Sequence, residues 1–243
     1  MDPITLLIVC PLVFLAMLVD AIAGGGGLIS LTAYLVAGLP PHVALGTNKV
    51  SSAIGTVVAT ARFAKSGLIK IKLAIPAVIF ALAGSAIGAK VALHTPDGVI
   101  QMIMVFALPV VAFFVLRKRA LDVPADATIS TKKQIAIIAI SSFFIGMYDG
   151  FYGPGTAAAK LPVREANGEA KCANLASNVA ALVTFAANGA VWWGLGLVAS
   201  VFAIAGSYVG SGLVMKNGAK VVRPIMLVVL ALLFVKVLYD LVF

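Results

Sequence analysis

Eight apolar runs, each long enough to cross a lipid bilayer, follow one another along this sequence. They fall near residues 4–23, 43–61, 73–93, 97–116, 134–150, 172–191, 195–215 and 221–242. A membrane-spanning helix needs about 20 mostly apolar residues. The chain is also 62% hydrophobic and only 11% charged, whereas soluble domains are about half apolar and about a quarter charged. The sequence therefore predicts an all-α integral membrane protein with about eight transmembrane helices.

The first of these runs is expected to stay in the protein as a membrane segment. Residues 1–19 carry no basic residues, and no small-residue cleavage site followed by a polar region comes after them. These are the features that would mark a removable signal peptide.

A polar, basic linker at residues 117–133 divides the chain into a first repeat, 1–116, and a second repeat, 134–243. When residues 46–116 are aligned with 168–238 without a gap, 21 of the 71 pairs are identical, against about 6 expected by chance from composition. Upstream, a shift of 129 aligns Asp20 with Asp149 and Gly24 with Gly153. The alignment predicts two homologous four-helix repeats, in parallel orientation unless the region between the aligned blocks changes the number of crossings.

Basic residues near 62–72 and in the 117–133 linker lie two crossings apart, on the same side of the membrane. The positive-inside rule makes that side cytoplasmic and favours both termini inside. Lys216, Lys220 and Arg223 would then lie outside, which opposes this orientation.

A glycine cluster interrupts each repeat after its first apolar run. It is Gly24, Gly25, Gly26 and Gly27 in the first repeat, and Gly153, Pro154 and Gly155 in the second. Consecutive glycines disfavour helix, and unwound backbone at membrane depth persists only where protein or water surrounds it. The short apolar runs 28–38 and 155–162 are expected to be half-helices or re-entrant segments that start at Leu28 and Thr156 with their N-termini facing an anion. The alternative is a simple turn or close helix packing.

A polar stripe marks one face of the helix that follows each break. In the second repeat it comprises Asn174, Ser177, Asn178, Ala181, Thr184 and Asn188. In the first repeat it comprises Ser52, Gly55, Thr56, Ala59, Arg62 and Ser66 in the same register, preceded by Thr47 and Asn48. Spacings of three and four residues place each set on one helical face. Amides and hydroxyls there could line a pathway for a small oxyanion. The alternative is helix packing with a few interhelical hydrogen bonds.

Ionisable residues inside the predicted spans form a further aligned set. Lys49 aligns with Lys171, and Asp20 aligns with Asp149. Such residues are costly in a membrane and usually face the interior of the helix bundle. We expect the lysines to attract an anion and the aspartates to be candidates for proton coupling. The alternatives are a structural Asp–Lys pair within each half, or charges at the headgroup level.

Other function classes lack their usual sequence features. The chain has no catalytic Ser/His/Asp or Cys/His arrangement and no phosphate-binding loop, so we expect neither an enzyme nor an ATPase. Two histidines and two cysteines without CxxC spacing predict no metal site and no cofactor. The 18 lysines and arginines form no basic stripe interleaved with aromatics, which argues against nucleic-acid binding.

Gly84-x-x-x-Gly88 and Gly206-x-x-x-Gly210 predict close helix packing, either between the halves or between the protomers of a homodimer.

Several of these motifs together resemble the TauE/SafE family of sulfite-exporter-like permeases. They are the block from Asp20 to Leu28, the block from Gly38 to Asn48 with Ser66-Gly67, and in the second half residues 150–155, 174–178 and 188–192. The resemblance covers nearly the whole chain. It implies secondary transport of sulfite, thiosulfate or small organosulfonates across a bacterial inner membrane, that is, the plasma membrane. One departure from internal symmetry is that Gly168-Glu-Ala-Lys171 stands where the first half has Gly46-Thr-Asn-Lys49.

From the motifs and the resemblance together, one substrate site between the two breaks is expected. Its predicted residues are Gly24, Gly25, Gly26, Gly27, Thr47, Asn48, Lys49, Gly153, Gly155, Lys171, Asn174 and Asn178, with Asp20 and Asp149 as coupling residues. The expected partners are the small anionic substrate and membrane lipid. A passive anion channel and, less favoured, a non-transporting membrane subunit are the alternative functions.

Overall fold

All regular secondary structure in the described part of the chain is α-helical. A computed structural model of the 243-residue protein describes residues 2–100, 102, 131–151 and 163–217. The helices are α1 (Pro3–Ala23), α2 (Gly26–Val36), α3 (Pro41–Lys65), α4 (Ile71–His94), α6 (Thr131–Phe151), α7 (Val163–Ala187) and α8 (Trp193–Asn217). The expected linker at 117–133 and the apolar runs 97–116 and 221–242 lie mostly or wholly outside the described residues.

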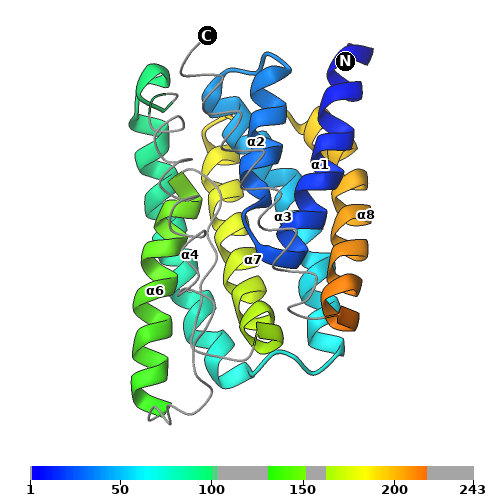
Figure 1. The fold of residues 1–243 in the computed structure, drawn as a ribbon. Helices are drawn as coiled ribbons and strands as arrows, with labels where there is room; N and C mark the ends of the chain where they lie inside the picture. The colour runs from blue at the N-terminus through cyan, green and yellow to red at the C-terminus, as the bar shows by residue number, and fades with distance from the viewer. Residues whose placement is uncertain (1, 101, 103–130, 152–162, 218–243) are drawn as a thin grey trace.

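Two long helices, α3 and α7, form the middle of the bundle (Figure 1). On one side α3 packs against α8, which in turn packs against α1; on the other side α7 packs against α4, which packs against α6. The order across the bundle is therefore α6, α4, α7, α3, α8, α1, with α2 packed against both α1 and α3. The two outer helix pairs thus enclose α3 and α7, the helices that carry the aligned lysines.

The first glycine cluster is a break in the helix, as the sequence predicts, but it is shorter than expected. Only Gly24 and Gly25 leave the helical conformation, with φ angles of 74° and 83°, a region that glycine enters without steric cost. The chain reverses there, so α2 runs back along α1 (Figure 1). The predicted start at Leu28 is wrong, because α2 already begins at Gly26.

The early start of α2 follows from how closely it approaches α1. A Cβ atom at Gly26 would overlap the carbonyl oxygen of Ala16 and lie 2.6 Å from the Cβ of Asp20. Only glycine lets the first turn of α2 lie against α1 at this point. The corresponding break in the second repeat, at residues 153–155, and the start predicted at Thr156 fall within 152–162, outside the described residues.

Both Gly-x-x-x-Gly motifs hold helices of opposite halves together. A Cβ at Gly84 or Gly88 of α4 would overlap the carbonyl oxygens of Phe143 and Met147 in α6. At the aligned positions of α8, Gly206 and Gly210 meet Phe14 and Leu18 of α1 in the same way. Small residues that let backbones approach are a main source of helix association in lipid. Of the two alternatives for these motifs, packing between the halves is therefore the one that the structure shows.

Three described helical segments are long and apolar enough to cross a membrane: Pro3–Ile22, Ile71–His94 and Trp193–Lys216. They belong to α1, α4 and α8, and α6 contributes a shorter apolar segment, Ile135–Phe151. The central helices α3 and α7 each have 25 residues, enough for about 37 Å of helix at 1.5 Å per residue. Their buried polar residues lower their hydropathy, which is tolerable because neighbouring helices rather than lipid surround them.

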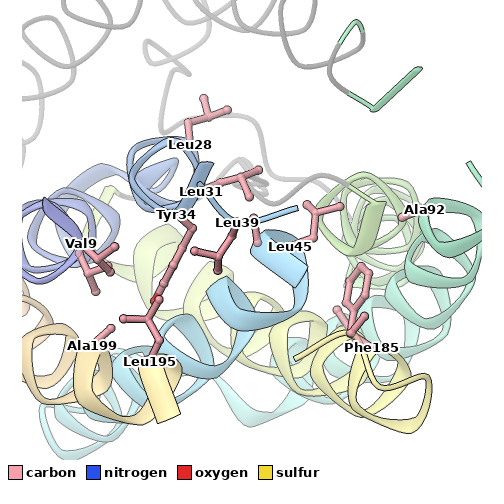
Figure 2. Packing of buried hydrophobic residues seen from close by; sticks show 14 of the residues in the cluster. Val9, Leu28, Leu31, Tyr34, Leu39, Leu45, Ala92, Phe185, Leu195 and Ala199 are labelled. Atoms are coloured by element: carbon pink, nitrogen blue, oxygen red, sulfur yellow. The ribbon is translucent and has the colours of Figure 1, made fainter. Parts of the chain in front are cut away.

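The apolar core near the start of α3 fixes α2 against the rest of the bundle. Tyr34 of α2 is fully buried and points toward Leu195 of α8 (Figure 2). Its hydroxyl lies 3.0 Å from the Ser51 hydroxyl of α3. A buried phenol needs such a partner, so this contact both satisfies the tyrosine and ties the short helix to α3.

Candidate functional site

The central helices α3 and α7 run antiparallel, which brings their buried polar faces together. Gly46, near the start of α3, lies against the carbonyl of Ala190 just after α7, and Gly168, near the start of α7, lies against the carbonyl of Leu68 just after α3. In this arrangement Lys49 and Lys171 are buried in the bundle, with exposed fractions of 1% and 4%.

The Lys49 ammonium is held by the second half of the chain. Its Nζ donates to the backbone carbonyl of Asp149 at 2.7 Å, to the Asp149 carboxylate at 3.2 Å and to Oδ1 of Asn178 at 3.1 Å. The Ser177 hydroxyl donates to the other carboxylate oxygen of Asp149. All four side chains are at least nine-tenths buried, so the ion pair is shielded from water.

The Lys171 ammonium is held by the first half in the same manner. Its Nζ contacts the Asp20 carboxylate at 2.5 Å and also donates to the Asp20 backbone carbonyl. That carbonyl belongs to the last turn of α1, directly before the glycine break, and it also accepts the Gly24 N–H. A cation at a helix C-terminus is favoured by the helix dipole. The first break therefore contacts the site through its carbonyl end, whereas the helix N-terminus after the break was expected to face an anion.

An amide link on α7 joins the two ion pairs. The Asn174 amide donates to the Asp20 carboxylate at 3.3 Å, and the Asn178 amide donates to Oδ1 of Asn174 at 2.9 Å. Asn178 in turn accepts from Lys49. A continuous chain of hydrogen bonds thus connects one ion pair with the other. We call this set the central network: Asp20, Lys49, Asp149, Lys171, Asn174, Ser177 and Asn178.

The pairing in the central network crosses between the halves. Lys49 pairs with Asp149, and Lys171 pairs with Asp20. The alternative of an Asp–Lys pair within each half is therefore wrong. The lysines also do not present a free positive field, because each is neutralised by a carboxylate. A substrate anion can therefore bind one of these lysines only when the paired carboxylate is neutralised or moves away.

Thr47 and Glu169 are aligned in the two repeats. Each accepts a backbone N–H just before a helix, at opposite ends of the bundle. The Thr47 hydroxyl accepts the backbone N–H of Trp192 at 2.9 Å, just before α8. The Glu169 carboxylate accepts the backbone N–H of Lys70, just before α4. Each side chain satisfies a donor at a helix start of the opposite half. This explains how threonine and glutamate can replace each other at a position where the two halves differ.

Thr47→Val should lower stability by about 1 kcal/mol, since losing a helix-capping side chain typically costs that amount. Thr47→Ser keeps the hydroxyl and should behave like the unmodified protein. Thermal unfolding of purified protein in detergent measures the difference. Equal melting temperatures for all three proteins would show that the contact with Trp192 contributes nothing to stability.

The remaining predicted residues are distributed unevenly around the central network. Asn48 is buried on α3, where its side chain accepts from Ser52 at 3.4 Å, and it belongs to neither of the two ion pairs. Arg62 lies near the end of α3, with its guanidinium over the Tyr208 ring at 3.9 Å. Asn188 is exposed beyond α7 and donates to the carbonyl of Thr184. Gly153 and Gly155 lie outside the described residues.

Sequence reasoning missed a small cavity beside Asp149. It has a volume of about 10 Å³, and its polar lining consists of Ser142, Asp149, Asn174 and Ser177. This is the size of about one water molecule, too small for sulfite. The missed residue is Ser142, the second of two adjacent serines on α6. Its spacing of seven residues from Asp149 was the available signal, because it places both on one face of α6.

Comparisons with known proteins agree with the membrane character of the site. Residues 9–237 match the sulfite exporter TauE/SafE family. A probable membrane transporter protein of Sinorhizobium is 35% identical over 237 residues, covering 93% of this chain and 90% of the relative. Probable membrane transporter proteins of Haemophilus influenzae and of Escherichia coli K12, the latter called YfcA, are each 30% identical over 241 residues, covering 93% and 94% of this chain and 92% and 89% of the relatives. No solved structure matches the chain.

Proposed function

Because this chain belongs to the TauE/SafE family of membrane transporters, we propose that it is a secondary transporter for a small sulfur-containing anion. Sulfite, thiosulfate and small organosulfonates are the substrate class, and the bacterial inner membrane is the location. The observation that carries the proposal is the central network: two buried lysines, each held by a carboxylate of the opposite half. The name of the matched family, sulfite exporter TauE/SafE, supports the sulfur chemistry.

The lysines suit exchange between a carboxylate and a substrate oxyanion. Both ligands present negatively charged oxygen atoms that an ammonium binds through charge-assisted hydrogen bonds. The amides of Asn174 and Asn178 add donors that carry no fixed charge. An arriving anion therefore replaces one negatively charged partner of a lysine with another, and the site avoids leaving an unpaired buried charge, which would be strongly unfavourable.

Release of a lysine requires that its aspartate lose its negative charge or leave. Protonation of Asp149 or Asp20 would do this, which makes both residues the coupling groups of the proposed mechanism. The ion pairs are at most one-tenth exposed, so a bound proton would be sheltered from exchange with water. Transport of the anion would then be linked to movement of a cation in the same direction.

Alternating access would arise from rocking one half of the chain against the other, with the halves as inverted repeats. Support comes from the antiparallel course of α3 and α7 and from contacts that recur at aligned positions. Each end of the bundle has one seal, where a glycine and a capping side chain at the start of α3 or α7 meet a loop of the opposite half. In the described conformation both of these contacts are formed, and the cavity beside Asp149 is the size of about one water.

Uptake into proteoliposomes tests the proposal directly. Purified protein would be assayed with sulfite, thiosulfate, taurine, sulfoacetate and chloride, with and without a pH gradient. Stimulation of labelled anion uptake by unlabelled anion on the opposite side identifies a carrier, since a channel shows no such exchange. Absence of transport for every sulfur-containing anion, in protein that is folded, would contradict the proposal.

Asn178→Ala should reduce anion transport about tenfold or more, which corresponds to about 1.4 kcal/mol, because it removes the amide between Lys49 and Asn174. The protein should still fold, since interhelical hydrogen bonds in membranes average about 0.6 kcal/mol. Asn188→Ala is the matched control: Asn188 is exposed and bonds only locally to the carbonyl of Thr184. Initial uptake rates, normalised to folded protein, measure both. Equal rates for the two variants would remove Asn178 from the site.

A further inference from the structure

The cavity beside Asp149 contains a hydroxyl whose hydrogen-bonding capacity is unused. Ser142 is 1% exposed, lines the cavity, and its Oγ has no hydrogen-bond partner among the described residues. A buried hydroxyl without a partner is costly, and in a native structure it calls for an explanation such as a bound ion or water. Cavity and hydroxyl together indicate a site for one small, oxygen-binding species.

We propose that this cavity is a Na⁺ site formed by Ser142, Asp149, Asn174 and Ser177, and that Na⁺ bound there releases Lys49 for the transported anion. The second part rests on the transport function proposed above. The first part concerns binding alone and stands on the cavity.

The chemistry of the lining favours a single monovalent cation. Its polar groups offer only oxygen ligands: one carboxylate, two hydroxyls and one amide. Hard cations prefer such ligands. A divalent ion would normally draw more than one carboxylate and six or more ligands, whereas this cavity has one carboxylate and room for one water-sized species. A proton bound to Asp149 would need no cavity and no additional hydroxyl.

The oxygen atoms retain capacity for an ion. The Ser177 oxygen donates its proton to Asp149, which leaves its lone pairs available. Asn174 Oδ1 accepts one hydrogen bond, from Asn178, and has a second lone pair.

Na⁺ and Lys49 compete for one carboxylate. Of the three hydrogen bonds made by the Lys49 ammonium, the one to the Asp149 carboxylate is the longest, at 3.2 Å. A Na⁺ ion at Asp149 neutralises the carboxylate that Lys49 neutralises in its absence. The freed ammonium then binds one negative charge of the anion, so one Na⁺ enters for each negative charge bound at Lys49. The other charged groups nearby, Asp20 and Lys171, remain paired with each other.

The two aspartates differ in whether a hydroxyl that could bind a cation lies beside them. With the shift of 129 residues that aligns Asp149 with Asp20, Ser142 aligns with Val13 and Gly146 with Met17. Both first-half residues are buried apolar side chains, and they supply no hydroxyl beside Asp20. The Na⁺ site is therefore assigned to Asp149 and not to Asp20.

Thermal unfolding of the full-length protein in detergent tests binding without knowledge of the substrate. At equal ionic strength, NaCl at several times the dissociation constant should raise the melting temperature by about 2–4 °C over KCl. Ser142→Ala should weaken the apparent Na⁺ affinity about tenfold or more, as loss of groups that support a metal site does. Ser141→Ala is the matched control, because the neighbouring Ser141 hydroxyl bonds to the carbonyl of Ile138 within its own helix.

The outcomes separate this inference from the transport proposal. A Na⁺-specific shift that Ser142→Ala loses and Ser141→Ala keeps supports the site, even if no tested anion is transported. Equal melting temperatures in NaCl and KCl, or a Na⁺ shift unchanged in Ser142→Ala, overturn it, even if transport is observed. In proteoliposomes that transport an anion, a Na⁺ gradient should accelerate uptake at constant pH, and rates indifferent to Na⁺ would overturn the coupling to Lys49.

Discussion

Lys49→Met should remove most folded protein from the membrane, and adding Asp149→Asn in the same chain should restore it. The single substitution leaves the Asp149 carboxylate buried without a cation, which typically costs about 3–5 kcal/mol. The double substitution removes both charges, and replacing a whole buried ion pair by neutral side chains is often close to neutral in stability. The restored double variant should nevertheless transport no anion, because the ammonium is gone. Size-exclusion chromatography of detergent extracts measures folded protein, and proteoliposome uptake measures transport.

The reciprocal pair makes this experiment specific to the geometry. Lys171→Met should be rescued by Asp20→Asn, its partner at 2.5 Å, and not by Asp149→Asn. If each aspartate rescued the lysine of its own half instead, the crossed arrangement would be wrong. Lys65→Met is the control for loss of a lysine as such, because Lys65 is exposed in the last turn of α3, and it should leave both folding and transport unchanged.

Gly26→Val should abolish both folding and transport. A Cβ at this position would overlap the Ala16 carbonyl oxygen and lie 2.6 Å from the Cβ of Asp20. A small movement of the α1 backbone or of the Asp20 side chain cannot relieve this overlap. Overpacking typically costs about 1–3 kcal/mol, and a branched side chain against backbone belongs at or above the upper end. Separation of α1 from α2 would also displace Asp20 and thereby the partner of Lys171. Yield of monodisperse protein and its uptake rate measure the two effects.

Two further glycines serve as graded controls. Gly25→Ala meets no atom within 4 Å but must hold a φ of 83°, so it should cost about 1–2 kcal/mol from backbone strain alone. Gly98→Ala has open space and no positive φ, so it should be neutral. A Gly26→Val protein as stable as Gly98→Ala would mean that α2 does not lie against α1 as described.

The sequence alone determined the class of protein and the candidates for its site. Apolar length and composition require lipid around the chain, and consecutive glycines weaken helix wherever they stand, because both effects depend on residues close together in the chain. The aligned lysines and aspartates were likewise visible, since ionisable groups in apolar segments are rare. No feature of the neighbouring sequence, however, distinguished a lysine that is available to an anion from one that is already paired with a carboxylate.

Tertiary structure decided which groups meet. Lys49 and Asp149 are 100 residues apart in the chain, and Lys171 and Asp20 are 151 apart. Their pairing depends on the antiparallel packing of α3 and α7, which hydropathy does not encode. The same packing places Thr47 at the start of α8 rather than beside the lysines. The packing of α6 against α7 places Ser142 and Asp149 around one cavity with Asn174 and Ser177.

The transport mechanism proposed for this protein depends on the crossed pairing of two buried lysines with the aspartates of opposite halves. The individual charges can be found in the sequence, because each is an exception within an apolar run. Their neutralisation cannot, because it exists only where four helices bring the side chains within hydrogen-bonding distance.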